Sequence, residues 1–137
     1  MRQTILKTHI KNTHYYDEAQ AKFVSGDVLV EDGVFTMLGE FGDSHGAKVI
    51  DGSAYLLLPS FQNAHTHVAM GLLRGYGSDT NLKTWLNDYI WPAEGRLSDE
   101  DVYWGTSLGL LEMLASGTTA FMEMYDHTEA IMEATSA

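Results

Sequence analysis

Two histidines one residue apart follow a short apolar run within residues 56–67, and this stretch sets the main limits on the fold. The run at residues 56–58 is continuous rather than alternating, which is typical of a strand covered on both faces, as in parallel sheets. Side chains alternate across a strand, so His65 and His67 are expected to point to the same side. Two such imidazoles can supply two ligands to a divalent metal ion. A His-x-His pair alone is weak support for a metal site, because it arises by chance in many proteins.

From this run onward the sequence predicts a strand, an irregular crossover, a helix, a second strand and a second helix. Ser98 is followed by three acidic residues, which is a good helix N-cap, and Gly117 suits the C′ position of the same helix. A β-rich run then covers residues 118–125, and a further helix is expected from Thr128. This βαβα order builds parallel sheets or barrels, in which the site lies beyond the carboxyl ends of the strands. His65 and His67 are expected there, and so are Glu123, Tyr125 and Asp126 after the second strand.

Two details of the helices are predicted from local patterns. The aromatic-rich helical piece at residues 85–91 is expected to stop at Pro92, because the residue before a proline disfavours helical backbone. In the helix after Ser98, Trp104, Leu108 and Leu111 fall on the apolar stripe of an amphipathic helix.

The sequence predicts two domains, a small β-sandwich module at residues 1–58 and an α/β part at residues 59–137. Asp32-Gly33 lies between two apolar runs and strongly indicates a hairpin, because both residues can take positive φ. The polar stretch at residues 11–20 is expected to lie outside a strand. Strands are predicted at residues 4–10, 23–30, 34–38 and 48–50. The module is too thin to carry an obvious site of its own.

The composition excludes several kinds of partner and site. With 8 basic and 19 acidic residues, the net charge of −11 repels nucleic acid and anionic lipid. No apolar run approaches the roughly 20 residues of a membrane span, and the N-terminus lacks the apolar segment of a signal peptide. The chain has no cysteine, so a transition metal would have to be held by His, Asp and Glu. A cytoplasmic protein without nucleic-acid or membrane partners is expected.

The sequence resembles the amidohydrolase superfamily, in particular the branch of methylthioadenosine/S-adenosylhomocysteine deaminases, guanine deaminases and triazine hydrolases. The resemblance rests on the Asn-Ala-His-Thr-His motif at residues 63–67 and on the Trp-Leu and Pro-x-Glu elements downstream. The matching segments are residues 58–67, 70–75, 85–86, 90–97, 117–119 and 124–125. Together they cover nearly the whole chain and are far more specific than His-x-His alone.

This resemblance implies an α/β fold, namely the first part of a (β/α)8 metallo-hydrolase barrel behind the β module. It implies one divalent metal, zinc with iron as the alternative, for which His65 and His67 are two ligands. Glu94 matches a substrate-binding position, which in nucleoside deaminases contacts the ribose hydroxyls, and Trp85 matches an aromatic residue of the pocket wall. The implied reaction is hydrolytic deamination of an adenosine-type or other heteroaromatic small molecule.

The barrel is expected to be incomplete, because a full barrel takes about 250 residues and far fewer follow Tyr55. The remaining ligands and the acid/base residue that the resemblance implies are expected beyond Ala137. Three hypotheses stay open. The chain is the first part of a deaminase, completed by a C-terminal portion or a homo-oligomer. Alternatively, it is part of a triazine-type chlorohydrolase or aminohydrolase, or a non-catalytic truncated fragment. The isolated chain is expected to be inactive.

Overall fold

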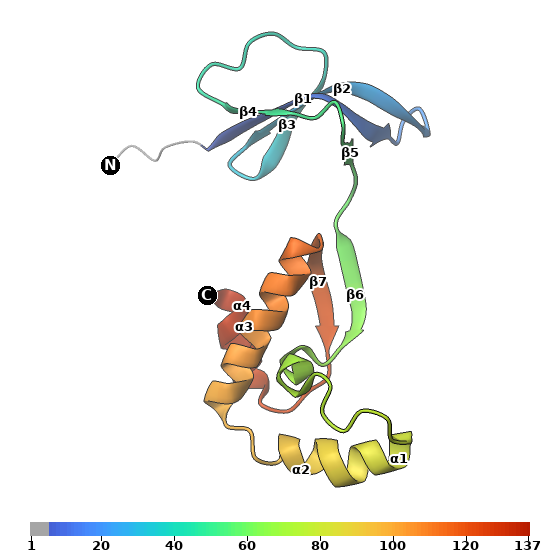
Figure 1. The fold of residues 1–137 in the computed structure, drawn as a ribbon. Helices are drawn as coiled ribbons and strands as arrows, with labels where there is room; N and C mark the ends of the chain where they lie inside the picture. The colour runs from blue at the N-terminus through green and yellow to red at the C-terminus, as the bar shows by residue number, and fades with distance from the viewer. Residues whose placement is uncertain (1–5) are drawn as a thin grey trace, which may run out of the picture. The chain divides into compact units, whose positions relative to one another are not determined.

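The computed structural model describes residues 6–137. They fall into two compact units, and the boundary in the chain lies between Pro59 and Ser60. The first unit is a mixed sheet, in which β1 pairs antiparallel with β2 and parallel with both β4 and β5, while β3 pairs with β2 (Figure 1). Its strands are β1 (Lys7–Asp17), β2 (Lys22–Glu31), β3 (Val34–Gly39), β4 (Lys48–Asp51) and β5 (Leu56–Leu57). Residues 6–59 form this one sheet, and a second sheet of the expected sandwich is not found among them.

The predicted hairpin at Asp32-Gly33 is confirmed, since the two residues have φ of 48° and 81°. The prediction that residues 11–20 lie outside a strand is wrong, because β1 continues to Asp17. A bulge interrupts the pairing of β1 with β2 just after Ile10, with Asn12 at φ 58°. The bulge breaks the alternation of side chains along β1. The second half of β1 is polar, so the sequence pattern does not indicate a strand there.

A buried histidine fixes the loop between β3 and β4 to the sheet. His9 is 1% exposed, and its two ring nitrogens lie 2.9 Å from Asp27 Oδ2 and 2.6 Å from Ser44 Oγ. Its ring also stacks on Phe41 at 4.7 Å between centroids. Both nitrogens of this buried polar group are thus satisfied, as burial requires.

The position of the apolar run at residues 56–58 is the main correction to the predicted strands. The run belongs to the first unit, where β5 pairs with β1 and where Leu56 and Leu58 are 48% and 50% exposed. It is therefore not the buried strand that carries the histidines. Pro59 lacks a backbone N–H and separates it from β6 (Phe61–Thr66), the strand of the second unit that does carry them.

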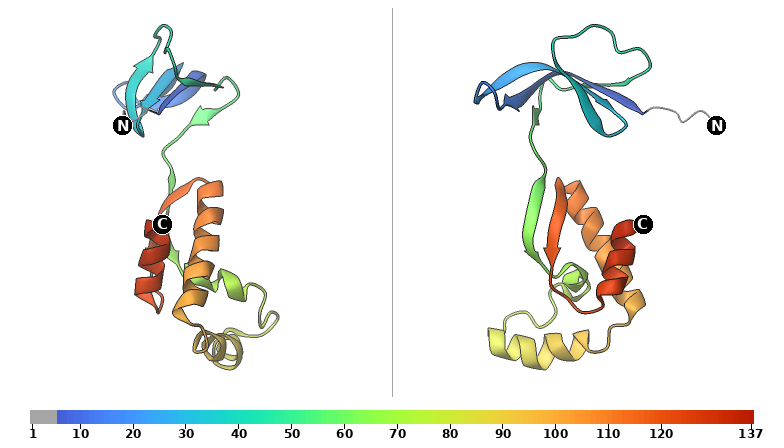
Figure 2. Two further views of the ribbon diagram at one scale, coloured as in Figure 1. Left: turned by 90° about the vertical axis from the view of Figure 1, so that its left-hand side faces the viewer. Right: turned by 180° about the vertical axis from the view of Figure 1, so that it is seen from behind.

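The second unit has the predicted βαβα order. β6 pairs in parallel with β7 (Thr118–Glu123), and α3 (Asp99–Ala115) lies between them in sequence and is followed, after β7, by α4 (Thr128–Ser136). The helices α3 and α4 pack on each other beside β7 (Figure 2). Their core is formed by Ala69, Val102, Ala130 and Ile131, with Phe121 and Tyr125 packed against it. Among the helices of residues 6–137, none combines the length and the apolar character that a membrane span needs.

The crossover from β6 to α3 is helical and lies beyond the carboxyl ends of both strands (Figures 1 and 2). The prediction that its helix stops at Pro92 is wrong. The Trp91 N–H bonds to the Leu86 carbonyl in a wide π-turn, so Pro92 falls in the first turn of the next α-helix, where no N–H is needed. The elements are η1 (Val68–Leu73), α1 (Leu82–Thr84), η2 (Trp85–Ile90) and α2 (Trp91–Glu94).

The ends of α3 are as predicted, but its buried face is not. Ser98 and Asp101 form a capping box, and Gly117 follows the helix with φ of 83°. The predicted stripe is open to solvent, because Trp104 and Leu111 are 61% and 66% exposed. The buried residues of α3 are Val102, Gly105 and Thr106.

Gly105 allows α3 to approach η1, the turn that follows the histidines. A Cβ at this position would lie 2.9 Å from both the Ala69 carbonyl oxygen and Leu72 Cδ1. We expect Gly105→Ala to lower the free energy of unfolding by about 1–3 kcal/mol through overpacking. Urea unfolding followed by tryptophan fluorescence measures this, since all three tryptophans are in the second unit. Gly71→Ala is the control, because it lies in the same unit and the nearest atom to a Cβ there is 3.8 Å away. Equal stability of the two variants would contradict the prediction.

Candidate active site

The two histidines lie together at the end of β6. Their rings are 5.2 Å apart between centroids and inclined by 78°, which agrees with the alternation argument that both point to one side. Between Asn63 and Thr66 the pairing with β7 shifts register, so β6 has an extra residue here. The Asn63 side chain accepts a hydrogen bond from the His65 N–H at 3.2 Å. Such bulges re-aim side chains near sites, and this one was not predicted from the sequence.

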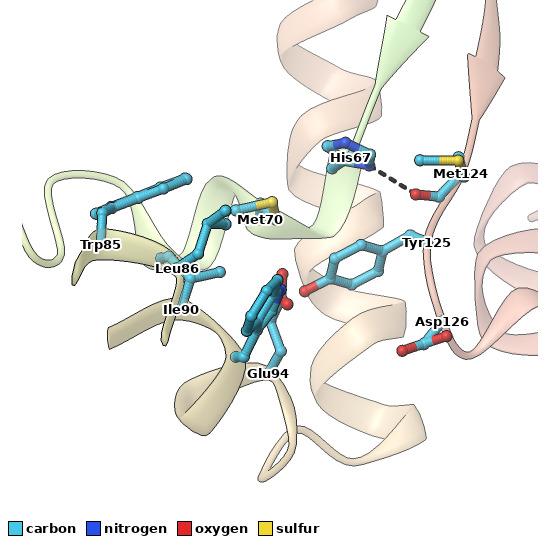
Figure 3. Close-up of a pocket in the computed structure, with 10 residues that line it drawn as sticks. His67, Met70, Trp85, Leu86, Ile90, Glu94, Met124, Tyr125 and Asp126 are labelled. Atoms are coloured by element: carbon cyan, nitrogen blue, oxygen red, sulfur yellow. Dashed lines mark hydrogen bonds between the residues drawn. The ribbon is translucent and has the colours of Figure 1, made fainter. Parts of the chain in front are cut away.

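The ring of His67 is oriented by the neighbouring strand. Its Nδ1 lies 2.6 Å from the backbone carbonyl oxygen of Met124 (Figure 3). A carbonyl oxygen only accepts hydrogen bonds, so Nδ1 carries a proton and donates it. Nε2 of the neutral ring is then an unprotonated nitrogen that is free to bind a metal. In metal-binding histidines, one ring nitrogen binds the metal and the other typically donates its proton to a carbonyl or carboxylate oxygen, as Nδ1 does here.

The Glu123 carboxylate links the ends of β6 and β7. One of its oxygens accepts from the Val68 N–H at 2.7 Å, and the other accepts from the Met124 N–H at 2.8 Å. The second oxygen is also 3.7 Å from Nδ1 of His67. A negative charge thus lies behind the imidazole, on the side away from Nε2.

A pocket of about 480 Å³ opens beside His67. It brings together three of the four residues predicted for the site, His67, Trp85 and Glu94, whereas His65 is not among its lining residues (Figure 3). Trp85 donates its indole N–H to the Tyr76 carbonyl at 3.0 Å, so it offers the pocket an aromatic surface rather than a donor. The apolar wall is completed by Met70, Leu86, Ile90, Trp91 and Met124.

Tyr125 is a pocket residue that the sequence places at the edge of the site without assigning it a role. Its hydroxyl is buried and has no hydrogen-bond partner among the described residues. Burial raises the pKa of Tyr125, and the carboxylates of Glu94, Asp126 and Glu123 raise it further. The hydroxyl therefore stays protonated near neutral pH. Its position directly after β7, at the same edge as the histidines, is the sequence feature that indicates a place in the site.

The donor set suits part of a metal centre. Zinc accepts neutral imidazole nitrogens, and its sites generally use three or four protein ligands. Within residues 6–137 no group of three or more His, Asp or Glu side chains is placed to hold a metal ion. His65 and His67 therefore fit two positions of such a centre, with the free Nε2 of His67 as the better defined one.

Similar proteins include deaminases of adenine nucleosides. The chain is 47% identical over 126 residues to 5-methylthioadenosine/S-adenosylhomocysteine deaminase of Pyrococcus furiosus. This match covers 92% of this chain and 30% of that protein. It is 42% identical over 137 residues to 5′-deoxyadenosine deaminase of Methanosarcina barkeri, covering 100% of this chain and 31% of that one. The chain thus spans about a third of the length of these relatives.

Solved structures and a family model agree with these relatives. A zinc-bound adenosine deaminase from Xanthomonas campestris superposes with a TM-score of 0.82 at 29% identity, over 96% of this chain and 31% of that one. Zinc-bound atrazine chlorohydrolase from Arthrobacter aurescens gives 0.76 at 20% identity, over 94% and 33%, and shows the shared fold. The predicted fold class, the opening part of an amidohydrolase barrel, is thereby confirmed. The model of the amidohydrolase family matches residues 56–137, and the chain belongs to this family.

Proposed function

We infer that the chain supplies part of the metal centre and part of the substrate pocket of a hydrolytic deaminase for adenosine-type nucleosides. The observation that carries this proposal is the geometry of His67, whose Nδ1 is 2.6 Å from the Met124 carbonyl, at the side of a pocket that contains Glu94 and Trp85. The names of the relatives at 42–47% identity support the adenosine-type substrate over a triazine.

His65 and His67 would hold one divalent metal, zinc in preference to iron. The chemistry that such a metal supplies when bound is activation of water near neutral pH. The remaining ligands would come from a complementing C-terminal portion, with a second copy of the chain as the alternative.

The side chains of the pocket have separate roles in this proposal. Glu94 accepts hydrogen bonds from hydroxyl groups of the substrate, since an ionised carboxylate has only acceptor sites. Trp85 provides an apolar surface for the heteroaromatic ring, and Met70 and Leu86 keep water from it. The ring carbon that bears the amino group would face His67, where water adds and ammonia leaves.

Activity is tested with the chain alone and with a joined protein. The joined protein carries this chain in place of the matching N-terminal third of the Pyrococcus furiosus relative. With zinc present, we expect the joined protein to release ammonia from 5′-methylthioadenosine, S-adenosylhomocysteine and 5′-deoxyadenosine, but not to hydrolyse atrazine. We expect no turnover by the chain alone, because two histidines are too few ligands for a stable zinc site.

Two outcomes would contradict the proposal. Atrazine hydrolysis without deamination would favour the triazine-type activity. A folded, zinc-loaded joined protein that acts on neither class would favour a non-catalytic role for the chain. Turnover by the chain alone would contradict the expected need for further ligands, and size-exclusion chromatography would then show whether a second copy supplies them.

A further inference from the structure

The loop between β7 and α4, residues 124–127, carries two of the groups that surround His67 (Figure 1). Its first residue is Met124, whose carbonyl oxygen lies 2.6 Å from Nδ1 of His67. Its second is Tyr125, whose ring lies 6.1 Å from that of His67 between centroids. A shift of this loop would therefore move the acceptor that decides which nitrogen of His67 carries the proton.

The last residue of the loop has a strained backbone. His127 has φ of 62° and ψ of 43°, in the left-handed region that costs free energy for any residue with a Cβ. It is the N-cap residue of α4, and its carbonyl accepts from the Ile131 N–H at 3.3 Å, but its side chain caps no N–H of the helix. Strained backbone of this kind persists where surrounding contacts hold it. The His127 side chain is free to make such a contact elsewhere.

That contact is with Asp99, in the first turn of α3. Nδ1 of His127 lies 2.6 Å from Oδ1 of Asp99, and His127 donates because an ionised carboxylate only accepts. The first turn of α3 is itself fixed by the capping box of Ser98 and Asp101. The Asp99 side chain is 84% exposed, so the pair adds little to the stability of the whole chain. Its effect is therefore expected on the position of the loop.

We propose that His127 is a positioning residue, whose hydrogen bond to Asp99 holds the loop so that the Met124 carbonyl selects the Nδ1-protonated form of His67. This inference rests on the proposed function, in which Nε2 of His67 must be unprotonated to bind a metal. Neither His127 nor Asp99 is among the residues that line the pocket beside His67. They act through the loop, and not on the substrate.

The protonated nitrogen of His67 is measured by NMR of the imidazole nitrogens in the 137-residue chain. The spectra are recorded without metal at about pH 8, where imidazole is ordinarily neutral, and the His67 signals are assigned by their loss in His67→Gln. We expect the unaltered chain to hold His67 mainly in the Nδ1-protonated form. In Asp99→Ala and His127→Gly, the ratio of the Nδ1-protonated to the Nε2-protonated form should fall about fivefold to tenfold, as for the loss of one hydrogen bond.

The choice of variants separates the position of the loop from folding. His127→Gly adopts the left-handed backbone without strain, so it should lose the bond to Asp99 and keep the fold. His127→Asn supplies an amide donor to Asp99 and tolerates the same backbone, so it should keep the ratio of the unaltered chain. His45→Ala is the matched control, because it removes an exposed contact with Asp43, at 3.1 Å, in the other unit.

An unchanged ratio in folded Asp99→Ala and His127→Gly would overturn the inference and leave the proposed function intact. A ratio in His127→Asn as low as in His127→Gly would also overturn it, because the bond to Asp99 would then not be what positions the loop. Predominant protonation of Nε2 in the unaltered chain would count against the proposed metal site, and the inference would fall with it. Circular dichroism shows whether each variant is folded, and Asp99→Ala decides the outcome if substitutions at His127 unfold the chain.

Discussion

Replacing His67 with alanine is expected to reduce deamination by the joined protein about a thousandfold and to remove its stoichiometric zinc. His67 is the proposed ligand whose ring is held most firmly, with Nδ1 donating to the Met124 carbonyl at 2.6 Å and Nε2 left free. Metal assistance to hydrolysis contributes several kcal/mol, and about 4 kcal/mol corresponds to a factor of about a thousand in rate.

Zinc content by atomic absorption and the initial rate of ammonia release give the two readouts. His45→Ala is the matched control, because the His45 side chain is 91% exposed in the other unit, and it should leave both unchanged. His65→Ala should also lose zinc. Full zinc occupancy in His67→Ala would exclude this residue as a ligand, whatever the rate.

Local signals were enough to predict several elements. The Asp32-Gly33 turn, the Ser98 cap and the glycine after α3 depend on backbone preferences of neighbouring residues, and the structure has all three. The adjacent rings of His65 and His67 were also expected from alternation, although a bulge between Asn63 and Thr66 and the end of β6 at Thr66 contribute to their placement. Features that depend on a few consecutive residues can therefore be read from the sequence.

Features that depend on distant partners could not be predicted in the same way. The run at residues 56–58 has the composition of a buried strand, but only its pairing with β1 assigns it to the first unit. The helix passes Pro92 because the π-turn before it removes the need for an N–H, which no propensity indicates. The βαβα order predicts that Tyr125 lies at the same edge as the histidines, but tertiary packing decides which residues of the crossover, such as Glu94, share its pocket.

Replacing Glu123 with alanine is expected to weaken zinc binding by the joined protein about 10–100-fold, the range found when a partner of a ligating histidine is lost. It should also lower the free energy of unfolding by about 2–4 kcal/mol, because the backbone N–H groups of Val68 and Met124 lose a charged acceptor. Val68 is 5% exposed, so water replaces the lost hydrogen bond poorly.

A graded series at this position separates the hydrogen bonds from the charge. Glu123→Gln keeps one oxygen for one N–H but loses the charge behind His67, so it should be more stable than Glu123→Ala while binding zinc almost as weakly. Glu123→Asp keeps the charge and should retain more zinc affinity than either. Competition with a chromogenic chelator gives the affinities, urea unfolding gives the stabilities, and Glu133→Ala, on the exposed side of α4, is the control. If Glu123→Gln bound zinc as tightly as the unaltered protein, the charge would have no part in orienting or polarising His67, and Glu123 would serve only to join the two strand ends.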